Sequence, residues 1–359
     1  MELIPEWAPN IHPMLVHFPI AVLLLAVVAD LLSFFLPDRW WDPVKTTVLY
    51  TVGAVSGIIT YYTGTLAAHS VFLPAGAQSV LTEHADWAWW TVWFFGLYAL
   101  LRIGLHGYRR FDGKPVRIML FLLALPGVFM LYETGDHGAK MVFGYGAGTG
   151  SLLEQETGRE AATTDSLTIA GASTFTLSEN GGWSWEIGPN GVSTLLNRFR
   201  WLQGGADDLR PAVVSNGDNH LLRLDPTSSP VFFVTRDSVQ DVQVDYWLDF
   251  SGFDGQISLV THVRDAGNYD FVTLDTDGTI SQGRVSDGSR EVLAEESYDA
   301  SGMLFIRTVG NGTHFRGYID REMVVHGHGD APETGSVGMR LDGRGTVLLD
   351  RIIVTALDG

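Results

Sequence analysis

Four apolar stretches in the first half of the chain constrain its fold most strongly. They cover residues 14–36, 46–68, 87–105 and 116–132, close to the roughly 20 apolar residues that a membrane-spanning helix needs. The first stretch is too long, and too close to the second, to be a cleaved signal peptide. We therefore predict four transmembrane helices that pack as a bundle over residues 1–145.

The charges that flank these stretches predict their orientation. Loops on the cytoplasmic side of a membrane protein carry an excess of Lys and Arg. The loop of residues 70–86 has no basic side chain, whereas the first and third loops hold six: Arg39, Lys45, Arg109, Arg110, Lys114 and Arg117. This pattern predicts a membrane protein whose N-terminus and second half both lie on the outer side, where the second half is periplasmic or extracellular.

Histidines gather at the outer face of this predicted bundle. Each helix brings at least one of them there: His12, His17, His69, His84 and His137. Neutral imidazole binds haem iron, copper or zinc, and four-helix bundles build such sites from facing side chains. We predict haem b as the cofactor, with copper or zinc as the alternative. The competing interpretation is a set of polar side chains at a wet membrane edge.

Four of these histidines are the favoured ligands of the haem iron or metal ion: His17, His69, His84 and His137. His12 is a weaker candidate because Pro13 separates it from the helix that carries His17. Nearby carboxylates could complete a zinc site, namely Glu83, Asp86, Glu133 and Asp136. Because the ligands cluster at one face only, we do not expect this chain alone to carry electrons across the whole bilayer.

Two charged residues lie inside the predicted spans. Asp30 is about two turns from the inner end of the first span, and Arg102 is about one turn from the inner end of the third. Charges at such a depth pair with each other or line a cavity. We predict that Asp30 and Arg102 form a structural ion pair that joins these two helices.

The first half resembles a bacterial family of small four-span membrane proteins. The segments that carry the likeness are IHPMLVHFPIA, YTGTLAAHS, EHADWA and ETGDHGAKMVFGYGAG, which hold the five histidines in order. Over residues 8–150 the chain is similar to domain of unknown function 2231. The resemblance implies a four-helix membrane fold and this set of histidine positions, while a haem or metal assignment is an inference for the family as well.

The second half has the pattern of an acidic all-β domain. Residues 151–359 hold 31 Asp and Glu against 15 Arg and no Lys, so binding to nucleic acid through bulk charge is not expected. Residues 146–165 are rich in Gly, Thr and Glu, which is typical of a linker. Beyond them, short alternating runs such as VFFVTR and VQVDYWLDF, separated by turns such as DTDG and GNG, predict an antiparallel β-sandwich over residues 166–359.

The last third resembles a concanavalin-like jelly roll of the laminin-G or keto-disaccharide-hydrolase type. The likeness rests on FRGYIDREMVVHGHG and on GSVGMRLDGRGTVLLDRIIVTAL. It implies a sandwich whose ligands are sugars, proteins or calcium. Glu186 is a lone acid in WSWEIG, and we find no pair of acidic residues for glycoside hydrolysis. An enzyme is therefore not the favoured interpretation.

Two short motifs of this domain have two interpretations each. Asp275 and Asp277 in DTDG could hold calcium, or they could simply shape a hairpin turn. His326 and His328 in HGHG could bind a metal ion, or they could form a polar strand edge.

Two functions are consistent with this sequence. The first is a membrane-anchored, haem b-binding electron-transfer or redox accessory subunit. Its external sandwich would dock another subunit of a membrane complex or a periplasmic redox protein. The alternative is a structural subunit without a redox role, which displays a partner- or carbohydrate-binding sandwich.

Overall fold

A computed structural model describes residues 10–36, 42–107, 113–147, 173–216, 219–228, 230–299 and 301–357. The chain divides into two compact units. One consists of Met1–Leu73 with Val80–Gly158, and the other of Pro74–Ser79 with Arg159–Gly359. Most of the predicted linker of residues 146–165 lies outside the described residues, as do Arg39, Arg109 and Arg110.

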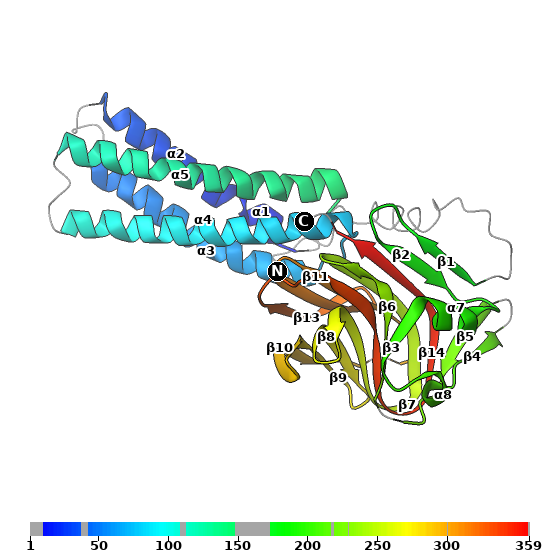
Figure 1. Ribbon diagram of the computed structural model, residues 1–359. Coiled ribbons are helices and arrows are strands. Elements are labelled where there is room, and N and C mark those ends of the chain that lie inside the picture. The colour runs from blue at the N-terminus through cyan, green and yellow to red at the C-terminus, as the bar shows by residue number, and fades with distance from the viewer. Residues whose placement is uncertain are drawn as a thin grey trace. The chain divides into compact units, whose positions relative to one another are not determined.

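The first unit is a bundle of long helices, with a short helical turn at its start (Figure 1). The helices are α1 (His12–Leu15), α2 (His17–Ser33), α3 (Pro43–His69), α4 (Gly76–Gly107) and α5 (Lys114–Ala139), and α5 continues into a π-helical turn, η1 (Lys140–Gly144). The start of α3 follows from its sequence. Pro43 occupies the first helical turn, and the Asp42 side chain accepts a hydrogen bond from the Val44 amide at 2.8 Å.

Among the described residues, three helical segments are long and apolar enough to cross a membrane: His12–Ser33, Gly76–Gly107 and Lys114–Gly144. The second predicted span is also a continuous helix, α3, of 27 residues. Its Thr, Tyr and Gly residues lower its hydropathy, so it is not among those three segments, and its crossing of the membrane stays a prediction. It packs against α2, where Gly53 gives room to Leu23: a Cβ at Gly53 would lie 2.5 Å from Leu23 Cδ2.

Small and aromatic side chains form the centre of the bundle. Ala26, Tyr50, Phe95 and Ala124 are each at most 1 % exposed. The outward faces instead carry exposed large apolar side chains along α2 to α5, such as those of Leu25, Ile59, Leu100 and Leu122. A helix that is apolar both inside and outside is typical of a lipid environment, which agrees with the predicted membrane bundle.

The second unit is an antiparallel β-sandwich, as the sequence predicts. Its strands are β1 (Thr174–Leu177), β2 (Trp183–Glu186), β3 (Phe199–Gln203), β4 (Ala212–Asn216), β5 (Asn219–Leu224), β6 (Val231–Val239), β7 (Val242–Asp265), β8 (Asn268–Asp275), β9 (Thr279–Ser286), β10 (Ser289–Ser297), β11 (Met303–Asn311), β12 (His314–Ile319), β13 (Glu322–His328) and β14 (Gly335–Ala356). Two short helices, α7 (Gly191–Arg198) and α8 (Ala206–Leu209), lie between the early strands.

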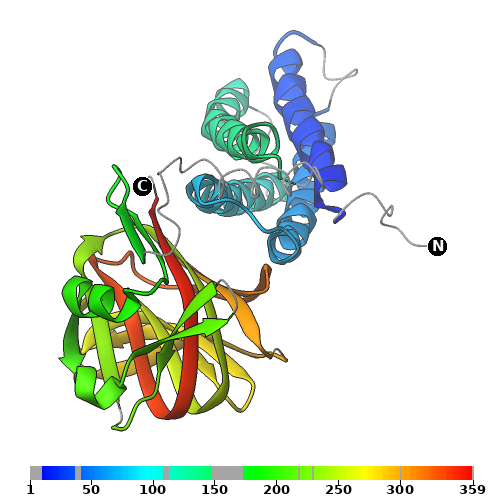
Figure 2. The same ribbon diagram turned by 90° about the vertical axis from the view of Figure 1, so that its right-hand side faces the viewer.

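Two long strands, β7 and β14, belong to both layers of the sandwich. They pair with each other along most of their length, and Figure 2 shows β14, in red, running along the whole domain. One layer has the order β13–β12–β11–β7–β14–β2–β1, and the other has the order β3–β6–β14–β7–β8–β9–β10. Gly255 and Gly345 sit where the strands pass between layers, at φ values of +138° and +108° that favour glycine.

The core lies between these two layers. Val244, Tyr246, Leu259, Met339 and Leu349 from the two long strands are fully buried in it. They alternate with residues that face the other way, as the period of two in a strand requires. The alternate side chains therefore point away from this core, on the outer face of each layer. They include three histidines of β12 and β13, which are considered below.

Candidate functional site

The structure brings three of the five predicted histidines together at one end of the bundle. His12 of α1, His84 of α4 and His137 of α5 are all at least partly buried there. The ring centroids of His12 and His84 are 6.4 Å apart, and the rings are nearly perpendicular at 79°. Three helices therefore contribute imidazoles to the same region.

Main-chain carbonyl groups fix the orientation of the His12 and His84 rings. His12 Nδ1 lies 3.1 Å from Thr60 O, and His84 Nδ1 lies 2.9 Å from Thr134 O. A carbonyl oxygen can only accept a hydrogen bond, so Nδ1 of each ring donates, and in the neutral imidazole Nε2 holds the lone pair. A ring held through one nitrogen in this way is the usual arrangement of a metal-ligating histidine.

Two glycines make room for these rings. A Cβ at Gly64 of α3 would lie 2.9 Å from His12 Cε1, and a Cβ at Gly138 of α5 would lie 3.2 Å from His84 Cε1. Any larger residue at Gly64 would therefore displace the His12 ring. Gly64 and Gly138 therefore leave space for the two rings and also limit where the rings can lie.

His137 has different partners. Its Nδ1 lies 2.8 Å from Glu133 O, and its Nε2 lies 2.5 Å from Glu83 Oε2. Both ring nitrogens therefore already contact oxygen atoms. The Glu83–His137 pair joins α4 to α5 beside the other two rings, and His137 can become a ligand only if Glu83 moves away. Asp136, another carboxylate predicted near this face, pairs with Lys140 at 2.7 Å.

The remaining two histidines are exposed. His17 lies on the outer side of α2, and its Nδ1 is 3.1 Å from Pro13 O. His69 is exposed at the last residue of α3. The geometry thus favours His12 over both His17 and His69. Pro13 does not separate His12 from the bundle, because it occupies the first turn of α1, and that short helix packs against α3.

The donor atoms of His12 and His84 are imidazole nitrogens, which suit haem iron and a bare copper or zinc ion alike. A small cavity of about 10 Å³ lies at the other end of the bundle, lined by Asp30, Ser33, Pro43, Arg102, Arg117 and Leu120. Its volume is about enough for one water molecule.

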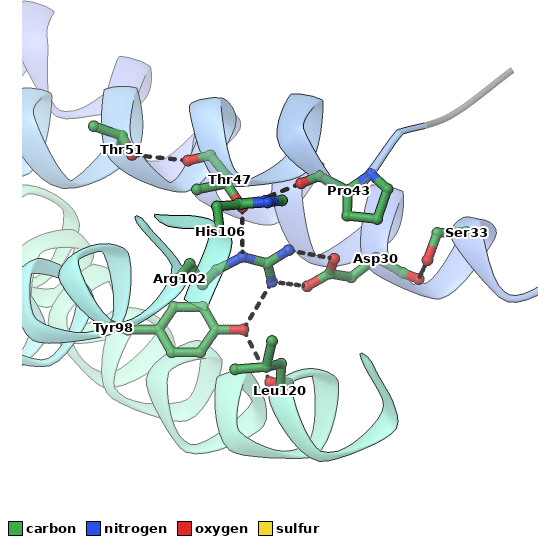
Figure 3. A network of polar contacts seen from close by, with 9 residues as sticks. All are labelled: Asp30, Ser33, Pro43, Thr47, Thr51, Tyr98, Arg102, His106 and Leu120. Atoms are coloured by element: carbon green, nitrogen blue, oxygen red, sulfur yellow. Dashed lines mark hydrogen bonds and ion pairs between the residues drawn. The ribbon is translucent and has the colours of Figure 1, made fainter. Parts of the chain in front are cut away.

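The opposite end of the bundle holds a network centred on Arg102 (Figure 3). Arg102 Nη1 and Nη2 lie 2.5 and 3.1 Å from the two carboxylate oxygens of Asp30. This is the ion pair that the sequence predicts, and it has the bidentate geometry that strengthens such pairs. The Arg102 side chain is 1 % exposed and that of Asp30 is 11 % exposed.

Other polar groups extend this network to all four long helices. Arg102 Nε donates to Thr47 Oγ1 at 3.2 Å, and Nη1 also donates to the Tyr98 hydroxyl at 3.0 Å. Tyr98 in turn donates to Leu120 O at 2.9 Å, and His106 Nε2 lies 3.0 Å from Thr47 Oγ1. Asp30, Thr47, Arg102 and Leu120 come from α2, α3, α4 and α5 respectively, so the network links every long helix of the bundle (Figure 3).

The acidic motifs of the sandwich have structural partners. Asp275 Oδ2 accepts from Gln256 Nε2 at 2.8 Å, and Asp277 Oδ1 accepts from the Thr279 amide at 2.9 Å, so these carboxylates shape the turn between β8 and β9. Calcium binding there stays a prediction. Glu186 lies 3.9 Å from Arg351 Nη1.

A second polar cluster in the sandwich is built around Asp270. His262 Nδ1 lies 2.8 Å from Asp270 Oδ2, and Arg284 Nε donates to Oδ1 at 2.6 Å. His262 Nε2 lies 2.5 Å from Gln240 O, so both ring nitrogens have a partner and the ring is not available as a catalytic base. Burial by itself would raise the pKa of Asp270, but the hydrogen bonds from His262 and Arg284 outweigh it and hold that pKa below its ordinary value.

This cluster predicts a pH-dependent contribution to stability. The pKa of Asp270 is lower in the folded state than in the unfolded state, so its contribution is full above about pH 4 and is lost as the pH falls through the folded value. We expect Asp270→Asn to lower the free energy of unfolding by about 1–3 kcal/mol near pH 7, because Arg284 and His262 lose a charged acceptor. The urea midpoints of variant and wild type, measured near pH 7 and near pH 3, should converge at the lower pH. A difference that stays constant between these values would contradict the assignment.

Comparison with known proteins bears on each unit separately. Residues 8–151 match the family described as "Predicted membrane protein (DUF2231)". This confirms the resemblance of the first half, and the match covers the helical bundle with all five predicted histidines. Comparison with curated proteins gives no match.

Solved structures similar to the chain are β-sandwich proteins. A carbohydrate-binding module, CBM66, from Bacillus subtilis has 17 % identity and a TM-score of 0.37, over 45 % of this chain and 98 % of that one. A Bacillus subtilis protein of unknown function with a galectin-like fold has 11 % identity and a TM-score of 0.36, over 50 % and 97 %. The galectin LEC-6 of Caenorhabditis elegans has 12 % identity and a TM-score of 0.28, over 37 % and 95 %. At these sequence identities and TM-scores, the similarities support no conclusion about the ligands of this chain.

Proposed function

We propose that the protein is a membrane-anchored redox accessory protein whose bundle holds a transition-metal centre at His12 and His84. The observation that carries this proposal is that both rings are held in the same way. Each donates through Nδ1 to a main-chain carbonyl, and their centroids are 6.4 Å apart on two different helices. Carbonyl groups of α3 and α5 thus position two Nε2 lone pairs from α1 and α4 at one end of the bundle.

The centre is either the iron of haem b or a bare copper or zinc ion. Imidazole suits all three. Iron or copper would supply one-electron transfer, whereas zinc would be structural and would contradict the redox part of this proposal. The chain's own contribution is to hold Nε2 of His12 and His84, to orient both rings through Thr60 and Thr134, and to keep the Glu83–His137 pair beside them.

Spectra and metal analysis of the purified full-length protein distinguish these identities. A sharp difference band between reduced and oxidised protein would identify haem b, and a featureless spectrum with bound copper or zinc would identify a bare ion. With His326 and His328 replaced by Ala in every sample, either result must disappear in the His12→Ala/His84→Ala variant. The proposal would be contradicted if the folded protein contained no haem or metal that these two substitutions remove. The remaining interpretation would then be a structural anchor that displays the sandwich.

The proposed centre faces the outer side of the inner membrane. The support is the position of the basic loop residues, which mark the cytoplasmic side of a membrane protein. Lys45, Lys114 and Arg117 lie near the Arg102 end of the bundle, opposite the histidines. In this orientation the acidic sandwich is periplasmic and suits a basic partner, such as a soluble redox protein or another subunit of a membrane complex. The alternative is that the sandwich binds carbohydrate and the bundle only anchors it.

The orientation predicts which side of the membrane each loop occupies. In right-side-out spheroplasts, we expect a single Cys introduced at Ser178, in the exposed turn after β1, to react with a membrane-impermeant maleimide. A Cys introduced at Gly113, before α5, should react only after the membrane is permeabilised. The chain has no native Cys, so each signal has one source. The reverse labelling pattern would contradict the orientation.

A further inference from the structure

Three histidines of the sandwich meet on the outer face of one layer. β12 and β13 are antiparallel neighbours, and their register pairs His314 directly with His328 and Arg316 with His326. His326 and His328 are two residues apart on β13, so they point to the same face. The register therefore places a third histidine, from another strand, beside the two of the HGHG motif.

The glycine between the two β13 histidines keeps them on this face. Gly327 pairs with Phe315, and a Cβ at Gly327 would lie 2.5 Å from Gln282 Oε1 and 2.7 Å from Leu293 Cβ. Only glycine therefore fits the inward-facing position at 327 without a shift of its neighbours. Because successive strand residues alternate faces, this fixes His326 and His328 outward.

The three rings are already grouped at the spacing of a metal site. The ring centroids are 4.5 Å apart for His314 and His328, 4.7 Å for His326 and His328, and 5.4 Å for His314 and His326. His314 Nδ1 lies 3.2 Å from His326 Nε2. One ligand atom from each of the three residues can be chosen so that all lie within 4.8 Å of one another.

These distances suit a small tetrahedral ion. Zinc–nitrogen bonds of about 2.0–2.1 Å in tetrahedral geometry separate two ligand nitrogens by roughly 3.3 Å. The His314–His326 pair is close to this value, and His328, which is exposed, can reach the same ion by a small rotation of its side chain. Burial decreases from His314 through His326 to His328, so the cluster is open to solvent on the His328 side.

We propose that His314, His326 and His328 form a binding site for a divalent transition-metal ion of the zinc or copper class. Three neutral imidazoles supply borderline nitrogen donors, which this class of ion prefers over the oxygen donors that suit calcium or magnesium. The fourth ligand of a three-histidine zinc site is commonly water. Arg316 lies on the same face beside His326 and does not occupy a ligand position.

Zinc binding to the full-length protein in detergent tests this site. The background is His12→Ala/His84→Ala, so the result does not depend on the centre proposed for the bundle. We expect this protein to bind zinc by calorimetry, and cobalt to give the visible absorption of a tetrahedral complex. His328→Ala should weaken zinc binding by roughly tenfold or more, as should His326→Ala. Replacing an exposed side chain such as His328 is not expected to disturb folding.

His220→Ala is the matched control. His220 lies on β5, which pairs with β4 and β14 and not with β12 or β13, so this variant should bind zinc as tightly as the background. His328→Asp keeps a donor atom and should recover part of the affinity lost in His328→Ala. No zinc binding by the background protein would overturn the proposal, as would equal affinity in the background, His326→Ala and His328→Ala proteins.

Discussion

Replacing Asp30 by Ala is expected to lower the free energy of unfolding of the bundle by about 3–5 kcal/mol. The substitution leaves the Arg102 guanidinium, whose side chain is 1 % exposed, without the carboxylate that accepts two of its hydrogen bonds. Thr47 and Tyr98 still contact the guanidinium but carry no charge to balance it. The measurement is unfolding of the detergent-solubilised protein in increasing SDS, followed by loss of helical circular dichroism.

Two controls separate the ion pair from general damage to the helix. Thr47→Val removes one neutral acceptor of Arg102 at similar volume, and should cost only about 1–3 kcal/mol. The exchanged pair, Asp30→Arg with Arg102→Asp, should recover part of the loss because it restores opposite charges between α2 and α4. If the exchanged pair were no more stable than Asp30→Ala, the network in Figure 3 would not depend on the charge pair.

The second large effect is expected at the histidine end. His84→Ala should reduce the amount of bound haem or metal by roughly tenfold or more, because it removes a donor whose ring is already fixed by Thr134 O. His12→Ala should have a similar effect through the ring fixed by Thr60 O. The quantity to measure is the amount of bound haem or metal per mole of purified protein. His326 and His328 of the sandwich are replaced by Ala in every sample, so that only metal bound by the bundle is counted.

The exposed histidines provide the contrast for this prediction. His17→Ala and His69→Ala should leave the bound amount nearly unchanged, because both residues are exposed. Gly64→Val should act like His12→Ala, since a Cβ at this position lies 2.9 Å from the His12 ring. A loss caused by His17→Ala and not by His12→Ala would show that the wrong pair has been assigned.

Much of the bundle could be predicted from local sequence. Hydropathy and length indicate the helices, and depth in the membrane is enough to match Asp30 with Arg102, because charges at that depth need a partner. The Thr and Tyr residues of α3 lower its hydropathy, so it is not among the three most apolar segments. It nevertheless forms a continuous helix that packs against α2, in agreement with the helix predicted for residues 46–68.

The arrangement of the histidines could be predicted only in part. The topology brings the five predicted histidines to one end of the bundle. Which of them face inward depends on the rotation of each helix about its axis and on where α1 starts, and α1 begins before Pro13 rather than after it. In the sandwich, the HGHG motif indicates two histidines on one face. His314 joins them through the register of β12 and β13, and a register between strands is not visible in any single segment.

The most direct test of the central claim is the haem and metal content of the full-length protein beside that of its His12→Ala/His84→Ala variant, both with His326 and His328 replaced by Ala. We expect haem or a transition-metal ion in near-stoichiometric amount in the first protein and little in the second, with both equally helical by circular dichroism. Equal content in the two proteins, or none in either, would contradict a centre at His12 and His84.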